Sequence, residues 1–174
     1  MNDSVRYERW LEYIKDECAK DSAFKKEIVD GYSKLGLSAS AYVLYWDMGF
    51  LRKFRTLEGM RKNLLAMAKT SLITISIFRN VAVQTLAKEQ MELYKVKNRR
   101  YGNSFAECYA IDGKAYAFGH LQEKINRICA LLRLHEEAKE EPIVDSFMDL
   151  FGYCVLTLCE LDKSEDDALQ NIKD

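Results

Sequence analysis

The scarcity of helix-breaking residues is the feature that most constrains this chain. Its 174 residues include one proline and eight glycines. Proline ends or kinks a helix because it lacks an amide hydrogen, and glycine costs about 1 kcal/mol in a helix interior. A chain of this length can bury a single core in one domain. We therefore predict an all-α fold over residues 1–174, a bundle of about five to six helices.

The spacing of apolar residues places these helices along the chain. Helices are expected over residues 5–18, 23–35, 38–50, 57–95, 120–137 and 142–161. A β-branched cluster at 72–83 leaves a strand as the alternative there. In the irregular segment 96–119, an Asp-Gly pair leaves a hairpin or a flexible loop open at 106–118. The polar tail 162–174 is expected to fray.

Charge and cysteine content narrow the class of protein. The net charge is −1, so no basic field favours nucleic acid as a partner. The five cysteines are odd in number and lack the CxxC spacing of zinc sites, which predicts reduced thiols packed in the core. The first residues do not resemble a signal peptide, and no run of 18 apolar residues predicts a membrane span. We expect a cytoplasmic location without a membrane, which is the host cytoplasm if the chain is phage-encoded.

Two carboxylates near the start of the last predicted helix are candidates for a metal site. Asp145 and Asp149 are four residues apart and so share one helical face. Paired carboxylates suit a hard cation such as Mg²⁺. A solvated face, or a favourable interaction with the helix dipole, is the alternative. After its first two turns this helix is apolar nearly all round, which predicts burial and a cation or a basic side chain as partner for the acids.

The preceding helix offers further polar candidates. Glu123 is a third candidate metal ligand, while Lys124 and Arg127 are candidates for binding phosphate. The alternative is a surface ion pair between Glu123 and Arg127 beside a solvated lysine.

A basic run precedes these helices. Four cations lie within six positions in KVKNRRYGNSF, and the candidate ligand-binding residues in it are Lys97, Asn98, Arg99, Arg100 and Tyr101. Cations and backbone amides near Gly102 would suit a triphosphate, and an aromatic ring would stack on a base. A solvated helix end, where cations are favoured by the dipole, is the alternative.

Three segments carry a family resemblance over residues 92–161. They read K-x-K-N-x-x-Y-G-N-S-F, E-K-x-N-R, and E-P-I-V-D-S-F-M-D-L-F-G-Y. In this order they resemble the nucleotide modification associated domain 1 family. The matching residues are Lys97, Asn98, Tyr101, Gly102, Ser104, Phe105, Glu123, Lys124, Arg127, Glu141, Asp145, Asp149, Leu150 and Tyr153. Arg100 departs from the aspartate usual in that family, and residues 1–90 match no family pattern.

That family is similar in outline to the MazG-like all-α NTP pyrophosphohydrolases. The resemblance implies that Glu123, Asp145 and Asp149 are catalytic and hold Mg²⁺ or Mn²⁺, with Tyr153 among the ligand-binding residues. It also implies a homo-oligomer, a dimer or higher. The E-x-x-E spacing of those enzymes is absent, and Arg127 stands near where a second acid is expected.

Three functions follow as expectations. The first is a Mg²⁺-dependent nucleotide pyrophosphohydrolase, and the second is a protein that binds or sequesters a nucleotide or nucleotide-derived signal without cleaving it. The third is a helical structural or interaction protein. Outside the motifs, the aromatic cluster of Tyr42, Tyr45 and Trp46 is expected to pack in the core, with base stacking across a subunit interface as the alternative.

Overall fold

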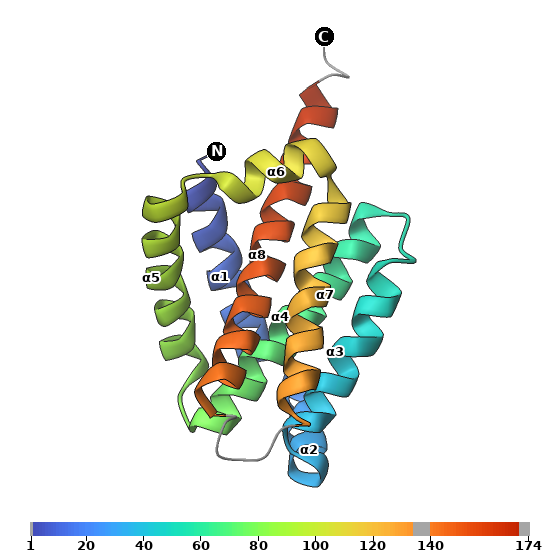
Figure 1. Ribbon diagram of the computed structural model, residues 1–174, viewed down its shortest axis with the longest axis vertical. Coiled ribbons are helices and arrows are strands. Elements are labelled where there is room, and N and C mark those ends of the chain that lie inside the picture. The colour runs from blue at the N-terminus through green and yellow to red at the C-terminus, as the bar shows by residue number, and fades with distance from the viewer. Residues whose placement is uncertain (1, 134–139, 171–174) are drawn as a thin grey trace.

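The computed structural model describes residues 2–133 and 140–170, and all of its regular structure is helical (Figure 1). The helices are α1 (Asp3–Lys20), α2 (Ser22–Leu35), α3 (Leu37–Leu51), α4 (Leu57–Arg79), α5 (Val83–Tyr101), α6 (Ser104–Asp112), α7 (Lys114–Leu131) and α8 (Glu140–Gln170). The all-α prediction is confirmed. The described residues form eight helices rather than five or six, because one predicted helix is divided in two and the segment predicted as irregular contains a further helix.

Helix α8 runs through the middle of the bundle and packs against α4, α7 and α1 (Figure 1). Its side chains Phe147, Phe151, Cys154 and Leu158 are completely or almost completely buried, which confirms the burial predicted from its apolar pattern. The five cysteines are free thiols, of which Cys18, Cys154 and Cys159 are buried in the core, while Cys108 and Cys129 are only partly buried. The aromatic side chains of Tyr42, Tyr45 and Trp46 are exposed, so the prediction that they pack in the core is wrong.

The predicted helix at 57–95 is two helices, and the chain bends by 112° between them. Asn80 ends α4 in the left-handed region, with a φ of 52°. A strand at 72–83, the alternative there, is wrong, because Leu72, Ile73 and Ile75 are buried on α4. The gain from burying these side chains outweighs the weak preference of β-branched residues for strands.

The segment predicted as irregular, with a hairpin or loop at 106–118, is helical instead. Gly102 and Gly113 have φ values of 61° and 60° and lie directly after α5 and α6. The Gly113 amide donates to the Tyr109 carbonyl at 2.7 Å, so the Asp-Gly pair ends a helix and does not form a hairpin turn.

The last helix also extends further than predicted. Helix α8 continues to Gln170, so fraying from residue 162 onward is wrong for the described part of the tail. Arg61 on α4 contacts Asp162 at 2.9 Å and Glu165 at 2.7 Å, and these ion pairs hold the added turns. The predicted end of the preceding helix at 137, and residues 171–174 of the tail, lie outside the described residues.

The segment Pro142–Glu165 of α8 is long and apolar enough to cross a membrane by length and composition. Of the 18-residue window in this segment that has such a composition, 67% is buried inside the bundle. A core helix of a bundle has the same composition, because every side of it faces another helix. The helices around α8 therefore account for its apolar character.

Asp47 on α3 is a partly buried acid whose titration we expect to affect stability. Burial raises the pKa of Asp47 to about 6. Because the folded state binds this proton more tightly than the unfolded state, stability from this group falls as pH rises from about 4 to 6. Partial exposure reduces the effect, and we expect Asp47→Asn to be about 1 kcal/mol more stable than wild type at pH 7.

Urea unfolding of wild type and Asp47→Asn at pH 4 and pH 7 checks this prediction. The two proteins should differ much less at pH 4, where the folded carboxyl is protonated and the unfolded carboxyl is about half protonated. Equal stability at pH 7, or a less stable Asp47→Asn, would show that burial does not penalise the charged carboxylate.

Candidate functional site

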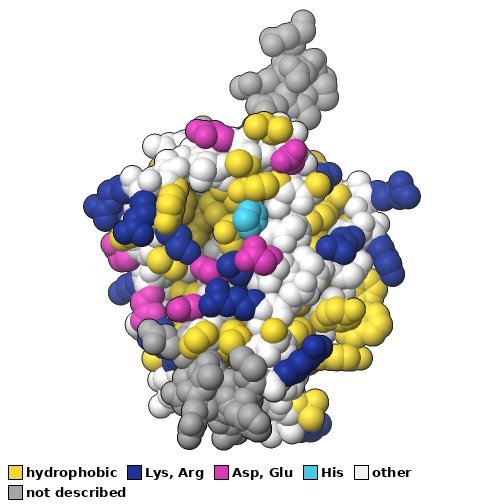
Figure 2. All heavy atoms as spheres, viewed as in Figure 1, with side chains coloured by type: hydrophobic (Ala, Val, Ile, Leu, Met, Phe, Trp, Pro, Cys, Tyr) yellow, Lys and Arg dark blue, Asp and Glu magenta, His cyan; other side chains and the backbone are white. Residues whose placement is uncertain are grey.

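A pocket of about 160 Å³ lies along α8, where α5 and α6 approach it. It extends from Asp149 to Glu160 on α8, and the start of α1 contributes Asp3 and Tyr7. Figure 2 shows it as a hollow lined by apolar side chains beside His120. Eleven positions of helix at 1.5 Å each give the lined face a length of roughly 16 Å. The pocket is therefore an elongated groove on one side of the central helix.

At one end of the pocket, two lysines from different helices converge on Asp149. Lys97 Nζ on α5 donates to Asp149 Oδ1 at 2.8 Å. Lys124 Nζ on α7 lies 3.2 Å from Asp149 Oδ2, so each carboxylate oxygen has its own lysine. Burial alone would raise the pKa of Asp149, but the two lysines outweigh it and the pKa is lowered. The acid is ionised at neutral pH, and its partners are basic side chains.

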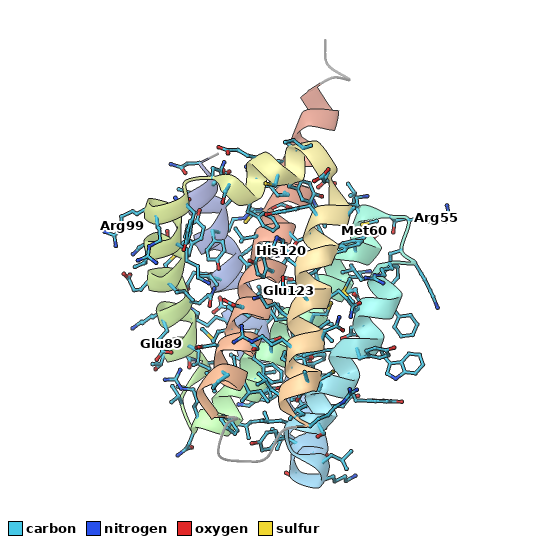
Figure 3. All side chains as sticks on the ribbon, viewed as in Figure 1. Arg55, Met60, Glu89, Arg99, His120 and Glu123 are labelled. Atoms are coloured by element: carbon cyan, nitrogen blue, oxygen red, sulfur yellow. The ribbon has the colours of Figure 1, made fainter. Side chains whose placement is uncertain are left out.

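An aromatic wall lies next to this charged cluster. Tyr153 on α8 stacks on His120 of α7, with ring centroids 4.6 Å apart and an angle of 10° between the rings. Phe105 on α6 lies 5.9 Å from Tyr153, and Tyr116 meets the His120 ring edge-on at 4.6 Å. Figure 3 shows His120 on the side of α7 that faces α8. Burial lowers the pKa of His120, so the imidazole is neutral at pH 7 and acts as part of the wall.

The middle of the pocket is formed by residues that the sequence did not single out. Tyr7 stacks on Tyr94 at 3.9 Å, and Gln90 Nε2 donates to the Tyr7 hydroxyl at 3.0 Å. Gln90 is 4% exposed, and its Oε1 has no hydrogen-bond partner in the described structure. A Cβ atom at residue 152 would lie 2.6 Å from Gln90 Nε2, so Gly152 makes room for the amide. A glycine inside a long helix was the signal that could have revealed this contact.

The far end of the pocket is tied together by Lys163. Its ammonium lies 2.8 Å from Asp3 and 2.8 Å from Glu160. Asn103, in the turn before α6, donates to Asp3 at 2.8 Å. These contacts hold the start of α1 and the turn at Gly102 against α8 and so fix the shape of the pocket.

The structure brings together part of the predicted site. Lys97, Asn98, Tyr101, Asp149 and Tyr153 line the pocket, and Lys124 adjoins it through Asp149. Gly102, Ser104 and Phe105 of the same motif line it too.

Other predicted residues lie elsewhere among the described residues. Asp145, Arg99, Arg100 and Arg127 are exposed and do not line the pocket. Glu123 is exposed and lies between Lys124, at 3.5 Å, and His120, at 3.7 Å. The side chain of Glu141 lies outside the described residues.

The three acids predicted to bind metal do not fit a magnesium ion as they stand. Within residues 2–133 and 140–170, no group of three or more His, Cys, Asp or Glu side chains is placed to hold a metal. Both oxygens of Asp149 contact lysines, while Asp145 and Glu123 face solvent. Mg²⁺ takes oxygen ligands in near-octahedral geometry, and adjacent ammonium groups repel it. The Mg²⁺ or Mn²⁺ cofactor stays a prediction.

Comparison with known proteins identifies no relative from which a function could be transferred. No family model, curated protein or solved structure matches this chain. The resemblance of its three segments therefore remains an expectation, and the pocket must be interpreted from its own chemistry.

Proposed function

We propose that this protein binds a nucleotide or a nucleotide-derived ligand in the pocket along α8. The observation that carries the proposal is the meeting of two lysines, Lys97 and Lys124, beside an aromatic wall. A phosphate needs cations, and a base needs aromatic faces. In this site the lysines lie next to the aromatic rings, as the phosphate lies next to the base in a nucleotide.

The lysine cluster is the part of the pocket that would bind the phosphate of the ligand. An ammonium group has three donors; Asp149 occupies one on each lysine, and Glu123 lies within 3.5 Å of Lys124. Lys97 and Lys124 are balanced by Asp149 and the exposed Glu123, so the cluster would hold a phosphate through its ammonium donors and not through an excess of positive charge. Arg99 and Arg100, in the last turn of α5, are exposed and do not line the pocket, and Figure 3 shows Arg99 pointing outward from α5. In this proposal Asp149 holds both lysines ready for the ligand.

The aromatic wall and the pocket interior are the parts of the site that would bind the base of the ligand. Phe105 and Tyr153 line the pocket, and stacking of a base on an aromatic ring contributes about 1–3 kcal/mol. Tyr101, 61% exposed, lies at the rim. Gln90 Oε1, which lacks a partner among the described residues, offers an acceptor to an N–H group once its side chain turns toward the ligand. The family resemblance of the 95–105 segment points to the same ligand class.

Binding without cleavage is the form of this function that the geometry supports better. A Mg²⁺-dependent pyrophosphohydrolase, as the resemblance implies, would need Glu123, Asp145 and Asp149 to converge on one ion. Asp149 is instead committed to Lys97 and Lys124. A purely structural role accounts for the two lysines as partners of the partly buried Asp149, but it leaves the aromatic pocket beside them without a use.

A thermal-shift panel of NTPs, dNTPs and dinucleotides, with and without Mg²⁺, tests the proposal. At a ligand concentration of 100 times Kd, binding stabilises the folded state by about 2.7 kcal/mol, which raises Tm by several degrees. We expect at least one nucleotide to do so without Mg²⁺ and to be recovered intact by chromatography. If no nucleotide raises Tm, the proposal fails, and if Mg²⁺ produces turnover, the hydrolase replaces it.

A further inference from the structure

Helix α3 presents an exposed row of aromatic side chains, which we call the aromatic face. Tyr42, Tyr45, Trp46 and Phe50 follow helical spacing and lie on one side of α3, and Phe54 comes just after its end. Their exposed fractions are 65%, 58%, 52%, 50% and 39%. Figure 2 shows a broad apolar patch on the flank where Figure 1 places α3. Nothing in the nucleotide proposal uses this surface.

The rings of the aromatic face pack on one another. Trp46 is at the centre, with ring centroids 6.1 Å from Tyr42, 6.5 Å from Tyr45 and 6.5 Å from Phe50. Lys53 Nζ lies 6.0 Å from the Phe50 ring at the end of the row. A surface whose side chains already support each other loses little conformational freedom when a partner covers it.

The aromatic face is large enough to form a dimer. Aromatic side chains have about 150–250 Å² of surface each, so these five leave roughly 500 Å² exposed. That value is near the top of the range for the largest apolar patch on a monomer. Two copies in contact would bury about 1,000 Å² through the aromatic rings alone, and neighbouring residues would add to it. A specific interface needs about this area.

Two further features favour a second copy of the chain as the partner. Asp47 is the one charged residue in α3 and is buried more than its exposed aromatic neighbours, and Lys53 lies at the end of the row, so the centre of a contact between identical faces sets no like charges against each other. Gly49 is exposed in the same row, and no described atom would lie within 4 Å of a Cβ there. Glycine weakens a helix interior, yet at this position it lets another helix backbone approach closely.

We infer that the aromatic face of α3 is the interface of a two-fold symmetric homodimer. In such a dimer the same surface meets itself, so the face has to be self-complementary. Helices α5 and α3 lie on opposite sides of the bundle (Figure 1). Among the described residues, none from α3 lines the pocket, so a contact at the aromatic face leaves the pocket free for its ligand. This inference does not depend on what the pocket binds.

Sedimentation velocity of the full chain from 1 to 100 µM tests the dimer. We expect a species of twice the chain mass of 20.2 kDa. Trp46→Glu should raise the dimer Kd by at least 100-fold, since it places two carboxylates in the centre of the interface. Tyr13→Glu is the matched control, because Tyr13 is an aromatic residue of α1 with 46% exposure, and it should leave the dimer unchanged.

A second variant separates loss of the interface from loss of folding. Gly49→Leu should strengthen the monomeric helix and yet weaken dimerisation, because it fills the space needed for close approach. A monomer throughout the concentration range, or a dimer that both Trp46→Glu and Gly49→Leu leave intact, would overturn the inference.

Discussion

Replacing Lys97 and Lys124 together by methionine is expected to weaken nucleotide binding at least 100-fold. A hydrogen bond to a charged group contributes about 1.5–3 kcal/mol, which corresponds to about 10- to 100-fold in affinity for each lysine. The two side chains reach Asp149 from α5 and α7 and are the cations that adjoin the pocket at this end. Isothermal titration of wild type and the double variant with the best nucleotide from the panel measures the change.

The control for this prediction replaces two other cations by methionine. Arg99 and Arg127 lie on the same helices as the two lysines but are exposed and outside the pocket lining in the described structure, so their loss should change Kd less than about 3-fold.

Removing both lysines leaves Asp149 without a partner and costs stability. Adding Asp149→Asn to the double variant restores neutrality. If that triple variant folds and binds as wild type does, phosphate does not lie at these lysines.

Truncation of Phe151 to alanine should cause the largest loss of stability of any change considered. Phe151 is completely buried in the middle of α8, where that helix packs on α4 and α7. Replacing a buried phenylalanine with alanine costs about 3–5 kcal/mol, because apolar contacts are lost and a cavity remains. The total stability of a domain is about 5–15 kcal/mol, so we expect Tm to fall by about 10 °C. Urea and thermal unfolding measure this loss.

An exposed apolar residue provides the comparison for Phe151. Ile111 is 82% exposed at the end of α6, and Ile111→Ala should change stability by less than about 0.5 kcal/mol. Similar losses for the two variants would mean that α8 is not the core of the bundle. That result would reopen the question of what covers the apolar surface of Pro142–Glu165.

The sequence was sufficient to predict the helical class and the burial of the last helix. Scarce prolines and an apolar pattern on all sides are local signals, and local signals decide both features. The helix boundaries predicted from the sequence were wrong where one type of residue is compatible with two local structures. Gly113 follows an aspartate, as in a hairpin turn, but it ends α6. Asn80 ends α4 without glycine or proline, because asparagine tolerates positive φ.

The pocket could be predicted only in part. A helical wheel shows which residues share a face of one helix, but it does not show which residues of other helices they contact. The wheel places Glu123 and Lys124 side by side, but the fold buries Lys124 and leaves Glu123 exposed. Lys97 reaches Asp149 across 52 positions of sequence, and no spacing rule connects such residues. Tyr7 and Gln90 come from the part of the chain without a recognised motif. Their roles depend on packing between α1, α5 and α8.

Binding of nucleotides to the wild-type protein in EDTA tests the central claim most directly. The ammonium groups of Lys97 and Lys124 require no metal, so titration calorimetry should show saturable binding of one nucleotide per chain when divalent ions are absent. The same nucleotide should bind the Lys97→Met, Lys124→Met protein at least 100-fold more weakly. Binding that appears only with Mg²⁺, or equal affinity of the two proteins in EDTA, would contradict the account.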